Sequence, residues 1–345
     1  MPPFNVAQDP AAGQLIDPVL TNLARAYQPA GFIYDQLVNS FPVQTISGQY
    51  PVFDDSFFGY GDDDAGAVDD RAPTPEIDFR YSTEHYRTKN YRRKVTISEE
   101  ERTNSHPALR LEYAKTQRLL TELASLRERR LAAITRGVDN GGQFTLRSAT
   151  PSTKWDNYSG AGPDIRGDIK SAQLAVYNGI GMWTNTIALT YPVAYAMALA
   201  PQIVDLIKYT VNGLEVLSLG DRVLPATLFG HRVVIARGAV TNVAGQGLTK
   251  RLAEIWSDSV RLLYVNEQPA WGMPSTVYGF RSPIGPMGQE TQDAQIPGGV
   301  TPASFALVQR WWQQDPPVEN IRAWERIDER IVAPDLGFEI ADTLT

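Results

Sequence analysis

Residues 107–135 read PALRLEYAKTQRLLTELASLRERRLAAIT and contain no Gly or Pro after the first position. Pro107 suits the first turn of a helix, where its missing N–H costs nothing, and Gly137 is typical of a helix end. Apolar side chains recur along one side of such a helix. They are Leu109, Tyr113, Leu120, Leu123, Leu126, Leu131 and Ile134. We predict one uninterrupted helix of 29 residues.

This helix is too long to be covered by the core of one compact domain. At about 1.5 Å per residue it would be about 43 Å long. Helices of compact domains usually have about 8 to 20 residues, so one core is too small to cover it. Its other side is charged and ends in Arg127, Glu128, Arg129 and Arg130. We expect another part of this chain, or a neighbouring subunit, to lie along it.

Composition excludes several classes of protein. The 345 residues carry a net charge of −7 with a pI near 5.1, which argues against a broad phosphate-binding surface but leaves room for a smaller basic patch. The absence of cysteine excludes disulfides, thiolate nucleophiles and cysteine-based metal sites. No run of about 20 apolar residues and no signal peptide occurs. We expect a soluble protein in a cytoplasm-like compartment.

The first 97 residues predict an arm and an extended hairpin. Residues 1–40 have one helical candidate, Asp17–Tyr27, and we expect this arm to lie across another surface; the alternative is a partly disordered terminus. From Ile77 to Ile97 apolar and polar residues alternate as in a strand, with Phe41–Phe53 as its partner. A run this long is expected to be broken or to protrude. Between the two arms, residues 54–75 include seven aspartates and predict a loop tip.

The remainder of the chain interleaves helices and strands. Asp164 can cap a helix that continues to Tyr177, and two helices divided at Pro201 are expected between Pro192 and Tyr209. Strand candidates follow the β-branched runs. They are Thr186–Thr190, His231–Gly238, Ser259–Val265, Val277–Arg281, Phe305–Trp312 and Val318–Ala333. Residues 164–281 therefore predict an α/β or α+β domain around a central sheet.

No motif for catalysis or metal binding is present in the sequence. His85, His106 and His231 are far apart and fit no metal-ligand spacing, so we interpret them as structural. The aspartates of the loop tip could collect a hard cation, but adjacent aspartates cannot all point inward, so a solvated tip is favoured. This tip could also form ion pairs with arginines of another subunit. We interpret the Trp311–Trp312 pair as core, with an interface anchor as the alternative.

The order of these features resembles the major capsid protein of tailed bacteriophages, the Hong Kong 97-like fold. Residues 78–134, DFRYSTEHYRTKNYRRKVTISEEERTNSHPALRLEYAKTQRLLTELASLRERRLAAI, are similar to the passage from the hairpin return into the spine helix of that family. Residues 187–210, IALTYPVAYAMALAPQIVDLIKYT, and 255–280, IWSDSVRLLYVNEQPAWGMPSTVYGF, resemble its A-domain segments. Residues 322–343, RAWERIDERIVAPDLGFEIADT, resemble its closing strand.

This resemblance implies an α+β fold with five segments. Residues 1–40 would be the N-terminal arm and 41–97 the E-loop, an extended β-hairpin. Residues 98–144 would be the P-domain with its spine helix 107–135, and 145–304 the α/β A-domain. Residues 305–345 would return to the P-domain as C-terminal strands. The resemblance also implies a structural subunit of an icosahedral phage head, with no catalysis, cofactor or metal.

The resemblance implies partners as well. The chain would assemble with itself into hexamers and pentamers around packaged double-stranded DNA, which it would contact loosely and without specificity. A portal, a decoration protein and a separate scaffolding protein are expected partners, the last because residues 1–40 hold no long helical prefix. The shell would assemble in the host bacterial cytoplasm, become part of the virion and contact no membrane. The alternatives are an encapsulin-like compartment subunit, a phage tail or adaptor protein, and an α/β enzyme without a recognisable motif.

Subunit contacts are expected at the tip of the E-loop and at one end of the spine helix. The candidates are Asp62, Asp63, Asp64, Asp69 and Asp70 on the loop tip and Arg127, Arg129 and Arg130 on the helix. The leucine stripe should pack on the strands from Phe305 to Ala333, leaving the arginine end for an acidic element of a neighbour. In some relatives an E-loop lysine is linked to a neighbour's asparagine, but the first lysine here is Lys89, beyond the tip. We predict no such crosslink, and a monomer of marginal stability without its neighbours.

Overall fold

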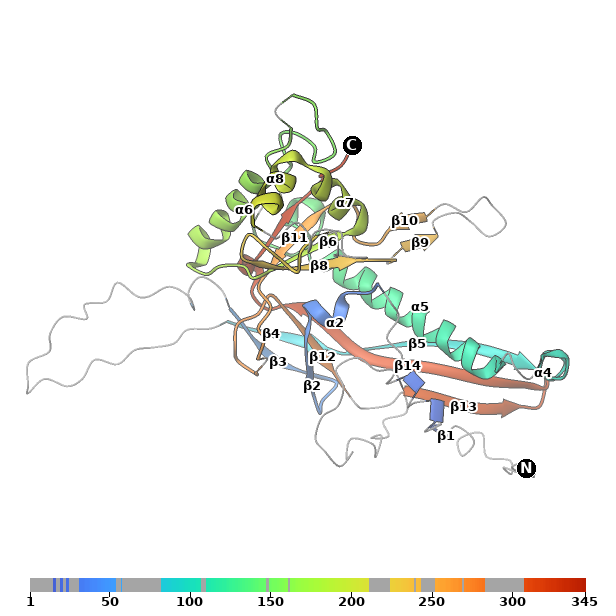
Figure 1. Ribbon diagram of the computed structural model, residues 1–345. Helices are drawn as coiled ribbons and strands as arrows, with labels where there is room; N and C mark the ends of the chain where they lie inside the picture. The colour runs from blue at the N-terminus through green and yellow to red at the C-terminus, as the bar shows by residue number, and fades with distance from the viewer. Residues whose placement is uncertain are drawn as a thin grey trace, which may run out of the picture.

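The described part of the fold contains a six-stranded sheet, a five-stranded sheet and two two-stranded ribbons, and a long helix lies on the six-stranded sheet (Figure 1). The computed structural model describes residues 15–16, 19–20, 23–24, 31–53, 57, 82–106, 110–146, 149–160, 162–210, 224–238, 240–242, 252–268, 270–282 and 307–345. The aspartate-rich loop tip therefore lies outside the described residues. In this described part no helix is long and apolar enough to cross a membrane.

The six-stranded sheet is organised around its longest strand, β14 (Val318–Ile331). Beside β14 lie β13 (Leu307–Gln313), β12 (Val277–Arg281) and β5 (Lys89–Ser98), all antiparallel to it. The sheet is completed by β1 (Leu15–Ile16) beside β13 and by β2 (Asn39–Pro42), which runs parallel to β12. Both predicted C-terminal strands are thus confirmed, and they are neighbours.

The long helix α5 (Leu111–Ile134) lies along β5 and β14, but it is shorter than predicted (Figure 1). Arg110 has a left-handed backbone with φ of 43°, which ends any helix on its N-terminal side. A separate short helix, α4 (Glu99–Asn104), precedes it, with the Ser98 side chain accepting from the Glu101 N–H. The prediction of one uninterrupted helix from Pro107 is therefore wrong at its start.

The leucine stripe packs on the returning strands, as predicted. Leu119, Leu120 and Leu123 are buried against β5, β13 and β14. Leu20 and Ala24 of the N-terminal arm join the same cluster and are 2% exposed, so this part of the arm covers its own subunit. Tyr113 departs from the prediction, because it is 36% exposed.

The predicted hairpin is present at its base and diverges at Thr88. Strand β3 (Ser47–Val52) pairs with β4 (Ser82–Arg87) in a separate two-stranded ribbon. Thr88 is buried, and its N–H and its hydroxyl both donate to the Ile46 carbonyl, at 2.8 and 2.9 Å. Beyond Thr88 the chain continues as β5 and pairs with β14. The long strand run that was expected to break therefore breaks at Thr88, where the chain leaves the two-stranded ribbon and joins the six-stranded sheet.

The five-stranded sheet confirms most of the interleaved predictions. Its order is β15 (Gly337–Ile340), β11 (Val260–Leu263), β6 (Thr186–Thr190), β8 (His231–Ala236) and β7 (Thr227–Leu228). The helices α6 (Ile165–Ile180), α7 (Tyr191–Leu199) and α8 (Pro201–Thr210) lie around this sheet (Figure 1). Asp164 caps α6 by accepting from the Gly167 N–H at 3.0 Å, and Pro201 divides α7 from α8, as predicted.

The division into sheets does not follow the expected boundary at residue 304. Strand β12 precedes this boundary and joins the six-stranded sheet, whereas β15 follows it and pairs with β11. The 3-10 helix η4 (Pro334–Leu336) carries the chain from β14 to β15. Val332 and Leu336 are fully buried in the core of the five-stranded sheet, so this crossing is part of the core.

Four smaller elements complete the described fold. Helix α2 (Tyr34–Leu37) precedes β2, and the 3-10 helix η2 (Val138–Asn140) follows α5. Strands β9 (Val240–Asn242) and β10 (Leu252–Glu254) form a second two-stranded ribbon. The interpretation of Trp311 and Trp312 as core is wrong for Trp312, which is 49% exposed on β13, and Trp311 is only half-buried.

Candidate functional site

Strand β14 carries opposite charges on its two faces. Its sequence VENIRAWERIDERI places Glu319, Glu325 and Glu329 at odd positions and Arg322, Arg326 and Arg330 at even ones. Successive side chains of a strand point to opposite faces. The glutamates lie on the face that α5 covers, as the buried contact of Ile321 with the helix leucines shows, and the arginines lie on the other face together with Asp328, which pairs with Arg330.

Two arginines of α5 bind the glutamate face. Arg130 Nε lies 3.1 and 3.0 Å from the two carboxylate oxygens of Glu329, and Arg127 Nε lies 3.1 Å from Glu325 Oε2. Arg130 also stacks over the Tyr91 ring of β5, at 3.7 Å from its centre. The expectation that this end of the helix is free is therefore wrong for Arg127 and Arg130, because buried carboxylates of the same subunit hold them. Arg129 is exposed, and its contact with a neighbour stays a prediction.

Glu128 is a buried anchor that the sequence reasoning missed. It is 0% exposed, and its Oε1 accepts from the backbone N–H groups of Ile33 and Tyr34 at 2.5 and 2.6 Å. Its Oε2 accepts from Trp256 Nε1 at 2.7 Å. Burial raises the pKa of Glu128 to about 7, although the three donors oppose the shift. Its spacing of three residues before Leu131 was the signal that could have placed it on the buried side.

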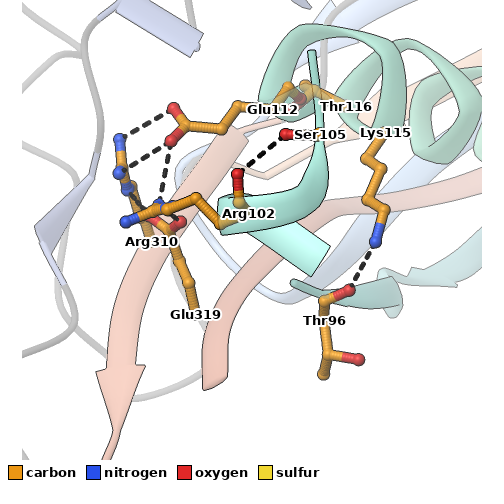
Figure 2. A network of polar contacts seen from close by, with 8 residues as sticks. All are labelled: Thr96, Arg102, Ser105, Glu112, Lys115, Thr116, Arg310 and Glu319. Carbon is orange, nitrogen blue, oxygen red and sulfur yellow. Dashed lines mark hydrogen bonds and ion pairs between the residues drawn. The ribbon is translucent and has the colours of Figure 1, made fainter. Parts of the chain in front are cut away.

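A second polar cluster holds the other end of α5 (Figure 2). Arg310 of β13 contacts Glu112 of α5, with Nη1 3.2 Å from Oε2, and also contacts Glu319 of β14. Arg102 of α4 pairs with the same two glutamates. Lys115 donates to the Thr96 carbonyl of β5 at 3.0 Å. Charged contacts thus bind the helix to the sheet at both ends, and leucines bind it between them.

The three histidines do not lie together in a metal or catalytic site. His231 is buried, with Nε2 2.9 Å from Thr184 Oγ1 and Nδ1 3.2 Å from the Phe229 carbonyl oxygen. His85 and His106 are exposed. Among the described residues no group of three His, Asp or Glu side chains is placed to hold a metal ion. The candidate aspartates Asp62, Asp63, Asp64, Asp69 and Asp70 lie outside the described residues.

Large apolar side chains are exposed around α6 and α7. Tyr177 and Trp183 are 41% and 51% exposed and stack on each other with ring centres 4.5 Å apart. Further exposed apolar side chains are Leu174, Tyr191, Tyr195, Leu199 and Val204. These side chains belong to α6, α7 and α8, and exposed apolar surface can serve a protein–protein contact. These residues were not predicted from the sequence as contact residues.

Comparison with known proteins agrees with this architecture. No family model matches the chain. The chain is 24% identical over 273 residues to the major capsid protein of Burkholderia phage BcepMu, a match that covers 73% of this chain and 77% of that protein. A crystal structure of a phage-related protein from Bordetella bronchiseptica matches with a TM-score of 0.63 and 19% identity, covering 96% of this chain and 98% of that chain.

A second solved structure is the capsid of the cyanophage P-SCSP1u. It matches with a TM-score of 0.56 and 11% identity, and the match covers 99% of this chain and 94% of that chain. The likeness therefore extends over both sheets and the long helix. The predicted resemblance is confirmed: the chain has the Hong Kong 97-like fold of bacteriophage capsid subunits.

Proposed function

We propose that this chain is the structural subunit of an icosahedral bacteriophage head. It assembles with itself into hexamers and pentamers that enclose packaged double-stranded DNA. The observation that carries the proposal is the fold likeness over nearly the whole chain, joined to the sequence similarity with a phage major capsid protein. The role is structural, and no cofactor or metal takes part in it.

The packing of the subunit supports a role in assembly. The charged clusters at both ends of α5 and the leucines between them bind this helix to the six-stranded sheet. The exposed Tyr177–Trp183 stack and its apolar neighbours would be covered by other copies. Burial that occurs only on assembly stabilises the folded state by mass action, so the free subunit is expected to be less stable than the assembled one.

The finer assignments are part of this proposal, and the order of the elements along the chain supports them. Residues 1–40 serve as the N-terminal arm, and 41–97 as an E-loop that lies over an adjacent subunit. Residues 98–144 and 305–345 form the P-domain, and 145–304 the A-domain, with β12 and β15 exchanged between their sheets. A separate scaffolding protein, a portal and a decoration protein are the proposed partners. Assembly takes place in the host cytoplasm, and the subunit ends in the virion.

Electron microscopy tests this function directly. The full chain is expressed alone and together with scaffold candidates encoded beside it, and the products are imaged by negative stain. Closed shells of uniform size are the expected result. Rings, tubes or small oligomers alone would overturn the proposal in favour of a tail or adaptor role. Shells that enclose a protein cargo and no nuclease-protected genomic DNA when purified from their natural source would indicate an encapsulin-like compartment.

A further inference from the structure

Strand β5 is an edge of the six-stranded sheet. Within the described part of the chain it pairs with β14 alone, from Lys89 to Ser98. An edge strand presents a row of backbone N–H and C=O groups to which a further strand can bind. In an antiparallel pair, alternate residues direct these groups toward the partner strand and away from it. The contacts of β14 and α5 show which residues of β5 direct their groups away.

Two hydrogen bonds identify the residues of β5 that face outward. The Arg326 carbonyl of β14 accepts from the Ser282 N–H, which follows β12, at 3.1 Å. Strands β12 and β5 lie on opposite sides of β14, so the even-numbered residues of β14 direct their backbone groups away from β5. Even-numbered residues of β5 lie opposite them, and the Thr96 carbonyl accordingly accepts from Lys115 Nζ of α5 at 3.0 Å (Figure 2). The backbone groups that face the open edge therefore belong to Asn90, Arg92, Lys94 and Thr96.

The open edge of β5 is basic on both faces of the sheet. Four exposed cations of this strand have no ion pair with another described residue, and they are Lys89, Arg92, Arg93 and Lys94. Val95 and Ile97 pack toward α5. Successive side chains of a strand alternate, so Arg93 lies on the helix face and Arg92 and Lys94 lie on the other. Charges on an edge strand oppose its pairing with a strand of the same charge, but they favour an acidic one.

The charges of β5 discriminate between three classes of occupant. A second copy of β5 paired about Arg93 would set Arg92 opposite Lys94, and like charges directly opposite each other destabilise a pair of strands. Duplex DNA would contact the cations through its phosphates, but phosphate oxygens only accept hydrogen bonds, so the outward C=O groups would gain no donor from them. An extended acidic peptide provides N–H donors, C=O acceptors and carboxylates together.

We propose that the open edge of β5 is a docking site for an extended acidic segment of a partner protein, which adds to the six-stranded sheet as a further strand. The backbone of this segment hydrogen bonds to Asn90, Arg92 and Lys94, and its carboxylates lie beside the exposed cations. Lys115 already holds the Thr96 carbonyl, so the added strand ends there. In this mode of recognition backbone pairing supplies affinity and side chains supply selectivity. The partner is a different protein, so the inference goes beyond self-assembly.

A labelled synthetic peptide tests the docking site on the unassembled full-length chain. The probe has about ten residues, the length of a typical long strand, with three consecutive glutamates in a background of valine and threonine. Fluorescence anisotropy should show that it binds. A peptide with lysines in place of the glutamates should bind about tenfold more weakly or not at all. An acidic peptide N-methylated at its central backbone nitrogens should also bind about tenfold more weakly, because it cannot donate to the outward C=O groups.

Proline substitutions test the register of the edge. Lys94→Pro removes an outward N–H together with the cation, whereas Lys94→Gln removes the cation alone. Lys94→Pro should therefore bind the acidic peptide about fivefold more weakly than Lys94→Gln. Arg93→Pro is the matched comparison, because it removes an N–H that faces β14, and it should lower the midpoint of thermal unfolding more than Lys94→Pro. Circular dichroism of each chain reports on folding.

Charge variants test the selection of an acidic partner without any change to the backbone. Arg92→Gln with Lys94→Gln should weaken binding of the acidic peptide about fivefold. The matched control is Arg166→Gln with Lys170→Gln on α6, which removes the same number of exposed cations elsewhere and should leave binding unchanged.

Each outcome decides the proposal. Weaker binding in both the folded proline variant and the charge variant supports it. Folded Lys94→Pro that binds the acidic peptide as tightly as Lys94→Gln overturns strand addition, and equal binding of the acidic and lysine peptides overturns the acidic partner. A short DNA duplex that binds more weakly to Arg92→Gln with Lys94→Gln, but equally to Lys94→Pro and Lys94→Gln, assigns the edge to nucleic acid. The assay uses unassembled protein, so a failure here leaves the shell-forming function untouched, and a failure to form shells leaves the docking site untouched.

Discussion

Arg130 of α5 and Glu329 of β14 form a two-pronged ion pair, with Arg130 Nη2 2.7 Å and Nε 3.1 Å from Glu329 Oε1 and Nε 3.0 Å from Oε2. Glu329 is nearly buried, with 5% of its side chain exposed, whereas 20% of Arg130 remains exposed. Removing one partner of such a pair leaves the other without compensation in a poorly solvated position. We expect Glu329→Gln to lower the free energy of unfolding by about 2 to 4 kcal/mol, measured by urea denaturation of unassembled protein.

The double variant Arg130→Met with Glu329→Leu serves as the control for this pair. It removes both charges and keeps apolar volume between α5 and β14. Its loss of unfolding free energy should therefore be smaller than that of Glu329→Gln. A double variant that is less stable than the single one would contradict the assignment. It would mean that these side chains stabilise the subunit mainly through other neighbours.

The buried carboxyl group of Glu128 should make the free energy of unfolding depend on pH. Its pKa is about 7 in the folded chain against 4.5 for a free side chain, so the folded state binds the proton more tightly. The stability that this group contributes is present below pH 4.5 and is lost as pH rises through 7, a change of about 3 kcal/mol. Glu128→Gln should remove this component of the pH dependence. Unfolding measured at steps between pH 4.5 and 7.5 checks the difference between the two proteins.

A matched comparison for Glu128 is the Trp256→Phe variant, which removes one donor and leaves the carboxylate. The loss of unfolding free energy in this variant should grow as pH rises, since the hydrogen bond from Trp256 Nε1 favours the ionised form of Glu128. Parallel pH profiles of wild type and Glu128→Gln would contradict a titration of Glu128 in this range.

Replacing a buried leucine should lower the free energy of unfolding much more than replacing an exposed one. Leu123 is 0% exposed between α5 and the sheet, and Leu123→Ala should cost about 2 to 5 kcal/mol in unfolding free energy. Leu174 is 51% exposed on α6, and Leu174→Ala should change subunit stability by less than about 0.5 kcal/mol. If the apolar surface is a subunit contact, Leu174→Ala should still reduce shell yield. Equal unfolding losses in the two variants would place Leu174 in the core.

Mature particles should show no covalent crosslink between subunits. No lysine precedes Lys89, so the loop between β3 and β4 has no amine to react with a neighbour's asparagine. Denaturing electrophoresis of mature particles should give one band at the monomer mass of 38.2 kDa. A ladder of bands above the monomer would contradict this prediction.

Features that depend on neighbouring residues in the chain could be read from the sequence. The Asp164 cap, the buried strand Thr186–Thr190 and the break at Pro201 each follow from local backbone chemistry, and each is present. The leucine periodicity predicted most of α5 and the strands it packs on, since one stripe can be covered by one sheet. The start at Leu111 was missed because the left-handed conformation of Arg110 carries no clear signal in residue type.

The sequence by itself determined the periodic elements, the acidic segment and the family resemblance. The tertiary structure decided which partner each charge meets. Arg127, Glu128 and Arg130 are one charged run in the sequence, yet packing directs the arginines to β14 and buries Glu128 against Ile33, Tyr34 and Trp256. Likewise, β12 joins the six-stranded sheet by pairing with β14, and β15 joins the five-stranded sheet by pairing with β11. Both pairings join strands that are far apart in the chain. A local pattern gives the face on which a side chain lies, but the solvation and partner of its charge depend on the segment that packs against that face.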